Sequence, residues 1–394
     1  MKIYDLIDPK EILARLEKLP DYRRVEEKVE HNQIYILFGV LCAMFVGNID
    51  MTEQHNWIKN NYNTIGFNRL IGEENNHLKI PSYPTVRRVI INIDSTIFEE
   101  IFREHFRSKV EINEETQLAV DGKTMNGSGR NGQYDVKRND GMFNVMETKA
   151  RIIIAHQEIG HKKSEIPAFY EIVGHHFSEV AFLYTFDALN TQKEGLDMIE
   201  EAKKRYLAKV KGNQKKLLKQ ITETFENESK NEVNNIVFFK DKDESIEGGK
   251  WVKRETYVLS SKDCDLVIFN SSFQHIRSII KQVKFITDKN GKEKIKVQYL
   301  IANYKDNARK FQETIKIHWV CETYHYYKDM LTKEDACKVS VNPFGLSILR
   351  SFVINHIQLY FNANKDENKK LKMKTIFKDC VNSPDFLGNF ENSA

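Results

Sequence analysis

Residues 118–124 read LAVDGKT, a short apolar stretch that runs directly into an aspartate, Asp121. The apolar residues predict a buried strand, and Asp121 would stand at its carboxyl end. Further apolar runs follow at residues 151–155 (RIIIA), 180–187 (VAFLYTFD) and 206–210 (YLAKV). Helical patterns lie between the later runs, at residues 164–173 and 193–205. Strands that alternate with helices predict an α/β domain with a partly parallel sheet.

The regions on either side of this domain show other patterns. Residues 1–110 carry apolar residues at helical spacing and predict a helical N-terminal domain, followed by the first part of the α/β core at residues 111–234. Successive strand patterns at residues 235–306 predict a strand-rich insertion. Helical patterns at residues 307–364 close the core. Residues 365–394 are polar and predict a loosely held C-terminal tail.

Composition sets broad limits on the class of protein. The 394 residues are 41% hydrophobic, which permits a large core and argues against general disorder. Sixty basic and 56 acidic residues give a net charge of +4, so only local clustering could indicate nucleic-acid binding. Five cysteines without a CxxC pair predict a reducing, cytoplasmic setting. The longest apolar run, residues 34–47, falls short of the roughly 20 residues of a membrane span and predicts a buried helix.

Two carboxylates stand at the ends of predicted strands. Asp121 ends the first strand, and Asp187 ends the strand at residues 180–187. Ligands of open α/β sheets bind outside the carboxyl ends of the strands, which places both residues at the functional edge. An aspartate at a strand end is also a common turn former or helix cap, so both interpretations stay open. The Gly-Lys-Thr after Asp121 is no P-loop, because Gln117 stands where that loop requires glycine.

A basic segment, KKRYLAKVKGNQKKLLK, covers residues 203–219 and contains no acidic residue. Lys209 and Lys211 follow a predicted strand, and the turn Gly212-Asn213-Gln214 precedes the next helix. Ammonium, amide and backbone N–H groups at a strand-to-helix turn favour contact with a DNA phosphate backbone. A solvated helical face is the alternative explanation of such a charge run.

A third candidate lies in KIHWVCETYHYYKD, where His318, Glu322 and His325 would share one face of a helix, with Asp329 one turn further on. A His/Glu/His row suggests a zinc site, but the HExxH motif is absent. An exposed polar helix face with aromatic residues in the core explains the spacing equally well.

Together these segments resemble the H-repeat-associated transposases, a group within the DDE transposases of bacterial insertion sequences. The matching segments occur in the order of that family across about residues 16–360: LPDYRR (19–24), IPSYPTVRRV (80–89), LAVDGKT (118–124), TFDALNTQK (185–193), YLAKVKGNQ (206–214), IHWVCETYHYYKDMLTKED (317–335) and ILRSFVIN (348–355). Each motif alone is weak, but the ordered set is fairly specific.

The resemblance implies a ribonuclease H-like catalytic core with Asp121, Asp187 and Glu322 as a DDE triad that holds two Mg²⁺ or Mn²⁺ ions. The 135 residues between Asp187 and Glu322 exceed a compact core of this type, and the strand-rich insertion accounts for them. The implied partner is double-stranded DNA, both terminal inverted repeats and target DNA, bound by a homodimer at the bacterial nucleoid and without a membrane. The N-terminal domain would bind DNA ends. The expected DNA-binding residues are Lys123, Lys209, Lys211, Asn213, Gln214, Lys316, His318, Trp319 and His325.

Three functions fit this sequence. The first is an active, Mg²⁺-dependent DNA transposase, which the intact triad favours. The second is a transposase-derived DNA-binding protein with little or no catalysis. The third is a related metal-dependent DNA nuclease that does not join strands. Terminal inverted repeats in the DNA that flanks the gene would favour the first of these.

Overall fold

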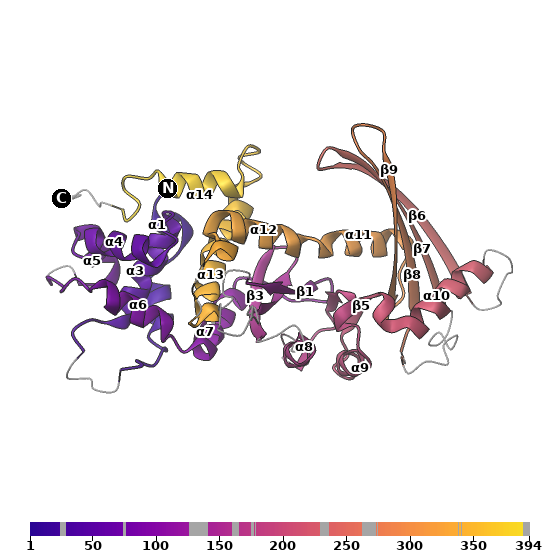
Figure 1. The fold of residues 1–394 in the computed structure, drawn as a ribbon, viewed down its shortest axis with the longest axis horizontal. Coiled ribbons are helices and arrows are strands. Elements are labelled where there is room, and N and C mark those ends of the chain that lie inside the picture. Colours follow the sequence, from indigo (N-terminus) through magenta and orange to yellow (C-terminus); the bar gives the residue numbers. More distant parts are fainter. Residues whose placement is uncertain are drawn as a thin grey trace, which may run out of the picture.

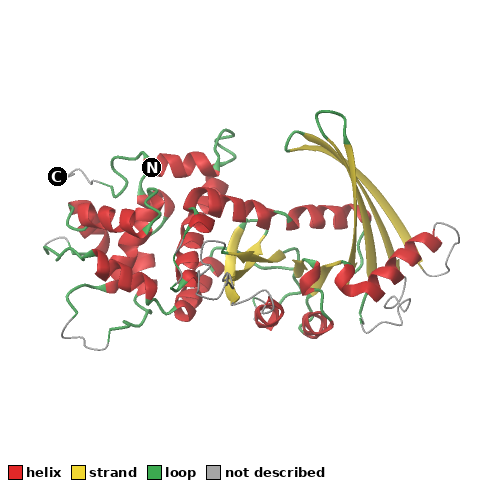
Figure 2. Cartoon of the chain, viewed as in Figure 1, coloured by secondary structure: helices red, strands yellow, loops and turns green. Residues whose placement is uncertain are grey.

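The computed structural model shows an elongated molecule with helices at one end and a strongly twisted sheet that extends to the other (Figure 1, Figure 2). It describes residues 1–23, 29–73, 76–125, 141–159, 165–174, 177, 179–228, 236–261, 273, 275–337, 339 and 341–388. Cys264 and the last residues of the predicted tail, 389–394, lie outside the described residues. Within the described ranges, no helix is both long and apolar enough to cross a membrane.

Helices form the N-terminal part of the chain. They are α1 (Ile3–Leu6), α2 (Pro9–Leu16), α3 (Gln33–Phe45), α4 (Met51–Asn61), α5 (Ile65–Ile71), α6 (Tyr83–Ile91) and α7 (Ser95–Arg107). Asp8, Asn32, Asp50 and Asp94 accept hydrogen bonds from the first backbone N–H groups of α2, α3, α4 and α7, which fixes where these helices begin. Helix α3 is apolar on all sides and almost wholly buried, as its sequence predicts.

One mixed sheet joins all nine strands of the described chain, in the order β3-β2-β1-β4-β5-β9-β8-β7-β6. The first five strands are β1 (Gln117–Thr124), β2 (Gly141–Glu147), β3 (Ile152–Ile159), β4 (Leu183–Phe186) and β5 (Arg205–Val210). Strands β1, β4 and β5 are parallel, whereas β2 and β3 are antiparallel to their neighbours. The fold is therefore mixed α/β. The sequence patterns did not indicate β2, which is buried along its whole length.

The strands of the predicted insertion extend this same sheet. They are β6 (Ile236–Glu247), β7 (Lys250–Ser261), β8 (Ser278–Thr287) and β9 (Glu293–Ala302). Strand β9 pairs antiparallel with β5 through Leu207–Val210, so the insertion continues directly from the edge of the core sheet. Only the last four residues of β9, Tyr299–Ala302, pair with β5. The preceding residues, 293–298, extend past the carboxyl end of β5 and so lie near the carboxyl ends of the parallel strands.

Helices cover both faces of the sheet. Between the strands lie α8 (Glu165–Gly174), α9 (Lys193–Glu201) and α10 (Lys215–Glu228), and after them come α11 (Ala308–His318), α12 (Val320–Thr332), α13 (Pro343–Asn364) and α14 (Met373–Val381). Phe311 and Ile315 of α11 pack on Leu300 of β9, while Phe225 of α10 contacts Tyr299 on the other face. Helices α7 and α13 pack against β3.

The prediction of a loosely held tail from residue 365 is wrong for most of that segment. Helix α14 buries Met373, Ile376 and Cys380 against α13, α12 and α3. The backbone N–H of Ile3 donates to the carbonyl of Phe386 at 2.8 Å, which ties the two ends of the chain together. The apolar residues at helical spacing outweigh the surrounding lysines and asparagines, because their burial removes apolar surface from water.

Candidate active site

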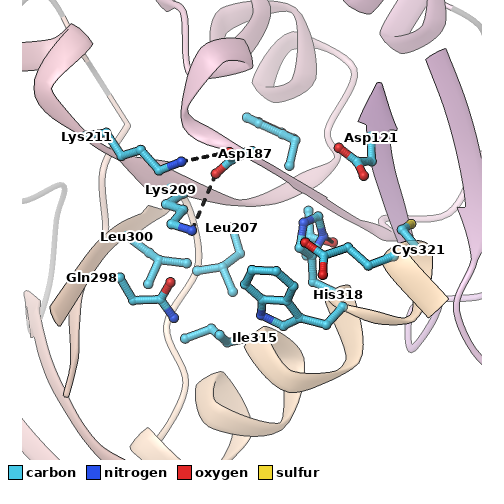
Figure 3. A pocket seen from close by; sticks show the side chains of 14 residues that line it. Asp121, Asp187, Leu207, Lys209, Lys211, Gln298, Leu300, Ile315, His318 and Cys321 are labelled. Atoms are coloured by element: carbon cyan, nitrogen blue, oxygen red, sulfur yellow. Dashed lines mark hydrogen bonds and ion pairs between the residues drawn. The ribbon is translucent and has the colours of Figure 1, made fainter. Parts of the chain in front are cut away.

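Asp121, Asp187 and Glu322 come from three separate elements and line one cavity of about 250 Å³ (Figure 3). Val120 of β1 is paired in parallel with Phe186 of β4, so the residues that follow them, Asp121 and Asp187, emerge at the same sheet edge. Glu322 lies in the first turn of α12. The preceding residue, Cys321, is buried against β1, with its Sγ 3.8 Å from the carbonyl oxygen of Ala119, and this contact holds Glu322 above the strand ends.

The neighbouring carboxylates disfavour ionisation of Asp121. Burial, followed by the charge of Asp187 and then of Glu322, raises the pKa of Asp121 to about 7. Burial also raises the pKa of Glu322. The surroundings therefore disfavour the ionised forms of Asp121 and Glu322, and a cation bound between these carboxylates would favour them.

Asp187 differs because two lysines face it. Lys211 Nζ lies 2.9 Å from Asp187 Oδ2 and Lys209 Nζ lies 3.6 Å from Oδ1 (Figure 3). Burial raises the pKa of Asp187, but the Lys211 hydrogen bond and the Lys209 charge outweigh it, so the net shift is downward. The ammonium of Lys209 also stands 5.4 Å from the centre of the Trp319 ring, a cation–π distance.

The oxygen donors suit a hard divalent cation, but the side chains do not form a ready-made ligand set. Among the residues that the structure describes, no three His, Cys, Asp or Glu are grouped closely enough to hold a metal ion. Asp187 is not free to act as a metal ligand in this arrangement, because its oxygens already face the ammonium groups of Lys209 and Lys211. Metal binding by all three carboxylates would require Asp187 to exchange these lysines for the ion.

Comparison with known proteins places the chain among the transposases. Residues 13–106 match the family model described as DDE_Tnp_1-associated. The chain is 30% identical over 217 residues to the protein named "Putative transposase YncI" of Escherichia coli strain K12, an alignment that covers 54% of this chain and 83% of that protein. The chain belongs to the H repeat-associated transposase family.

Other members align over most of their length. The protein named "H repeat-associated putative transposase YhhI" of Escherichia coli K12 is 25% identical over 338 residues, which cover 84% of this chain and 85% of that protein. Among solved structures, a piggyBac transposase synaptic complex with hairpin DNA covers 95% of this chain and 76% of that chain. Its sequence identity of 13% and TM-score of 0.44 are too low to support an argument about this H repeat-associated transposase.

Most of the residues that the family resemblance suggested for DNA binding lie at or beside the cavity. Lys209, Lys211, His318 and Trp319 line it, and Trp319 is 45% exposed. Lys316 is exposed on α11, with its Nζ 3.8 Å from Asp243 Oδ2. His318 turns inward, where its Nδ1 lies 2.9 Å from Thr185 Oγ1 and burial lowers its pKa to about 4. We therefore regard His318 as a neutral support of strand β4.

Three further residues predicted to contact DNA make polar contacts within the protein: Lys123, Gln214 and Asn213. Lys123 is 9% exposed and pairs with Asp329 at 2.9 Å, because β1 carries it under α12. Gln214 is buried and donates to the carbonyls of Ala188 and Thr191 at 2.9 and 2.8 Å. Asn213 is exposed and donates to the same Ala188 carbonyl at 2.7 Å. These two amides brace the turn that follows Asp187.

His325 is largely buried beside Asp121. Its Nε2 lies 3.0 Å from the Asn144 amide nitrogen, and its Nδ1 lies 3.7 Å from Asp121 Oδ2. Burial, followed by the charges of Lys123 and Lys328, lowers the pKa of His325 to about 3, so the ring is neutral at neutral pH. Since Nε2 accepts the amide hydrogen, the ring proton stands on Nδ1 and faces Asp121. His325 is thus a neutral neighbour of Asp121.

The sequence patterns missed the contribution of the insertion. A second cavity of about 900 Å³ adjoins the first and shares Lys209, Lys211, Trp319 and Glu322 with it. Strands β7, β8 and β9 add the basic residues Arg254, Lys284 and Lys296 to its wall. These three are neighbours across the sheet, because Arg254 is paired with Lys284 and Lys284 with Lys296. Burial raises the pKa of Glu322, and the charge of Lys296 is close enough to oppose part of this rise.

The raised pKa of Asp121 predicts a stability effect of its own. The folded protein retains a proton on Asp121 up to about pH 7, whereas the unfolded chain loses it near pH 4. The folded state is therefore destabilised as pH rises through this window. Without metal, Asp121→Asn should increase the free energy of unfolding at pH 8 by about 2 kcal/mol, a value reduced from the full shift because the side chain is partly solvated. Below pH 4 the gain should disappear. Urea unfolding in EDTA at both pH values measures it, and an equal gain at both would refute the electrostatic explanation.

Proposed function

We propose that this chain is a DNA transposase that cuts and joins phosphodiesters by two-metal DDE chemistry, on a ribonuclease H-like core formed by β1–β5. The observation that carries the proposal is the cavity itself. Three carboxylates far apart in the sequence, Asp121, Asp187 and Glu322, line one opening at the carboxyl ends of parallel strands, with lysines on its rim. Membership of the H repeat-associated transposase family agrees with this chemistry.

Asp121, Asp187 and Glu322 would hold two Mg²⁺ or Mn²⁺ ions. Bound there, such ions would activate a water or a 3′-hydroxyl as the nucleophile and would stabilise the leaving oxygen of an in-line displacement. The residues of the chain contribute the rest. Neutral His325 lies beside Asp121, and the exposed ring of Trp319 offers a stacking surface for an unpaired base.

Lys209 and Lys211 have a double role in this proposal. In the free protein they neutralise Asp187. When DNA enters, its phosphates offer the lysines another anionic partner, and Asp187 becomes free to bind metal. The same exchange brings the scissile phosphate next to the carboxylates. Two protomers would act together on two DNA ends, and the substrate places the protein at the nucleoid in the bacterial cytoplasm.

One observation favours the second candidate function, a DNA-binding protein with little catalysis. The three carboxylates do not form a three-ligand set within the described chain, and Asp187 is paired with lysines. The test is a strand-cleavage assay on duplexes made from the DNA that flanks the gene on both sides, with Mg²⁺, with Mn²⁺ and with excess EDTA. Metal-dependent cleavage is expected. Binding without cleavage under either metal would favour the DNA-binding protein, and cleavage that persists in EDTA would refute two-metal chemistry. Cleavage without joining would identify a nuclease.

A further inference from the structure

A cavity of about 610 Å³ lies between the N-terminal helices and the connection from α12 to α13, away from the acidic site. In the helical part of the molecule (Figure 1), α6 packs against both α4 and α13. Residues of α4 and α6 form one wall, and Lys333, the residues after it and Arg350 of α13 form the other. None of the three triad residues and none of the nine residues expected to bind DNA lines this cavity, although Arg87, Lys333 and Arg350 fall within segments that carry the family resemblance.

Arg350 is the notable residue in this cavity. It is 3% exposed, and its Nε has no hydrogen-bond partner. Within the described part of the chain, its guanidinium forms no ion pair. The carboxyl whose pKa Arg350 influences, Glu334, is already paired with Lys328 at 2.9 Å. Arg254, which is also buried, differs from Arg350 because it pairs with Glu247 and Asp243. A buried guanidinium without such a partner is costly, and an anion supplied from outside would stabilise it.

Two more cations face the same space. Arg87 is exposed on α6, and Lys333 is exposed at the C-terminal end of α12. Their side chains form no ion pair with any residue that the structure describes. The two acidic residues on the wall, Asp50 and Glu53, are occupied in capping α4: Asp50 accepts the N–H groups of Thr52 and Glu53, and Glu53 accepts that of Asp50. The cavity therefore presents three cations and two carboxylates that already have partners.

We propose that this cavity binds a phosphate group, with Arg350 as the buried anchor and Arg87 and Lys333 at the rim, and that in the working protein the phosphate belongs to the DNA backbone. A guanidinium fork suits the oxygens of a phosphate, and flanking cations add affinity. The identity of the ligand as DNA rests on the proposed function.

The position of the cavity agrees with a duplex that continues from the acidic site. Glu322 lies in the first turn of α12, and Lys333 directly follows its last residue. Eleven residues of α-helix span about 16 Å, which corresponds to roughly five base pairs of DNA. The exposed side chain of Tyr326 lies on the same helix between Glu322 and Lys333. A phosphate bound here would therefore fix the direction in which the duplex leaves the active site.

The variants Arg87→Ala and Lys333→Asn test the proposal. Asparagine removes the charge of Lys333 and tolerates its left-handed backbone, φ 48°. The matched control is Arg88→Ala, because Arg88 neighbours Arg87 on α6 but does not line the cavity. Binding of a random duplex of about 30 base pairs is measured as a function of salt. Each rim variant should weaken binding about 3- to 10-fold and lower the salt slope by about one, while Arg88→Ala should change both less.

Arg350 itself is tested by NMR, because a buried variant could fail to fold. In protein labelled with ¹⁵N-arginine, the Nε–H signal that Arg350→Lys removes should shift when duplex or inorganic phosphate is added. Unchanged salt slopes in both rim variants, with wild-type binding intact, would overturn the DNA assignment and leave the proposed function standing. If the wild type binds no duplex, the proposed function fails, and the phosphate titration alone decides: a shift supports a site for free phosphate, and no shift overturns it. Displacement of phosphate by polyglutamate but not by duplex would reassign the cavity to an acidic peptide.

Discussion

Asp121→Asn should bind DNA as well as the wild type and cleave it about 10³-fold more slowly or not at all. The substitution keeps the shape of the side chain but removes one of the three carboxylates in the cavity. A two-metal site depends on anionic oxygen ligands to hold its ions and to make the attacking oxygen nucleophilic. DNA binding depends mainly on the lysines and arginines, so its affinity should persist or rise slightly as repulsion of phosphate falls.

Cleavage and binding are measured in parallel with Mg²⁺ and Mn²⁺ on the flanking-DNA duplexes. The control is Asp197→Asn, because Asp197 pairs with Lys193 on α9 and does not line the cavity. That variant should cleave normally. Normal cleavage by Asp121→Asn would remove Asp121 from the active site. Loss of both binding and cleavage, with a lower unfolding midpoint, would show a structural role for this side chain.

The strands of the core could be predicted where the sequence alternates or forms a short apolar run between turns. Strand β2, GMFNVME, defeats this rule because it is buried on both faces and contains Gly, Asn and two Met, so it lacks alternation and has only one β-branched residue, Val145. Helix α14 was missed for a different reason. Met373, Ile376 and Cys380 have helical spacing, but the lysine-rich surroundings suggest a tail, and only the hydrophobic face offered by α13 and α3 makes the helix stable.

The candidate site could be predicted in part. That Asp121 and Asp187 emerge at the same edge follows from the parallel pattern, although β1 does not end at Asp121 as predicted but continues to Thr124 in its pairing with β2; Glu322 came from the family resemblance. What sequence cannot provide is the partner of a polar side chain. Lys123 meets Asp329, which is 206 residues further along the chain, and this contact withdraws its charge from solvent. Lys296 reaches Glu322 only because β9 pairs with β5, a pairing that no local pattern encodes.

The double variant Lys209→Ala, Lys211→Ala should change two affinities in opposite directions. Both ammonium groups lie within 4 Å of Asp187, at 3.6 and 2.9 Å, so their removal frees that carboxylate and makes the cavity more negative. We expect Mn²⁺ to bind the protein without DNA about 10-fold more tightly. The same two groups are proposed to contact DNA phosphates. Duplex binding at moderate salt should therefore weaken about 10- to 100-fold, with the salt slope reduced by about two.

Mn²⁺ binding is followed by calorimetry or electron paramagnetic resonance, and duplex binding by a salt titration. Lys215→Ala with Lys216→Ala is the matched control, because these lysines are exposed at the start of α10 and line neither of the two adjoining cavities. It removes the same charge from the same basic segment, so it should leave Mn²⁺ affinity unchanged and reduce duplex affinity less. Opposite changes in the two affinities would distinguish an exchange of lysines between Asp187 and phosphate from a simple loss of positive charge. If Mn²⁺ affinity stays constant while duplex affinity falls, the lysines bind DNA but do not hold Asp187 back from metal, and the proposed exchange is wrong.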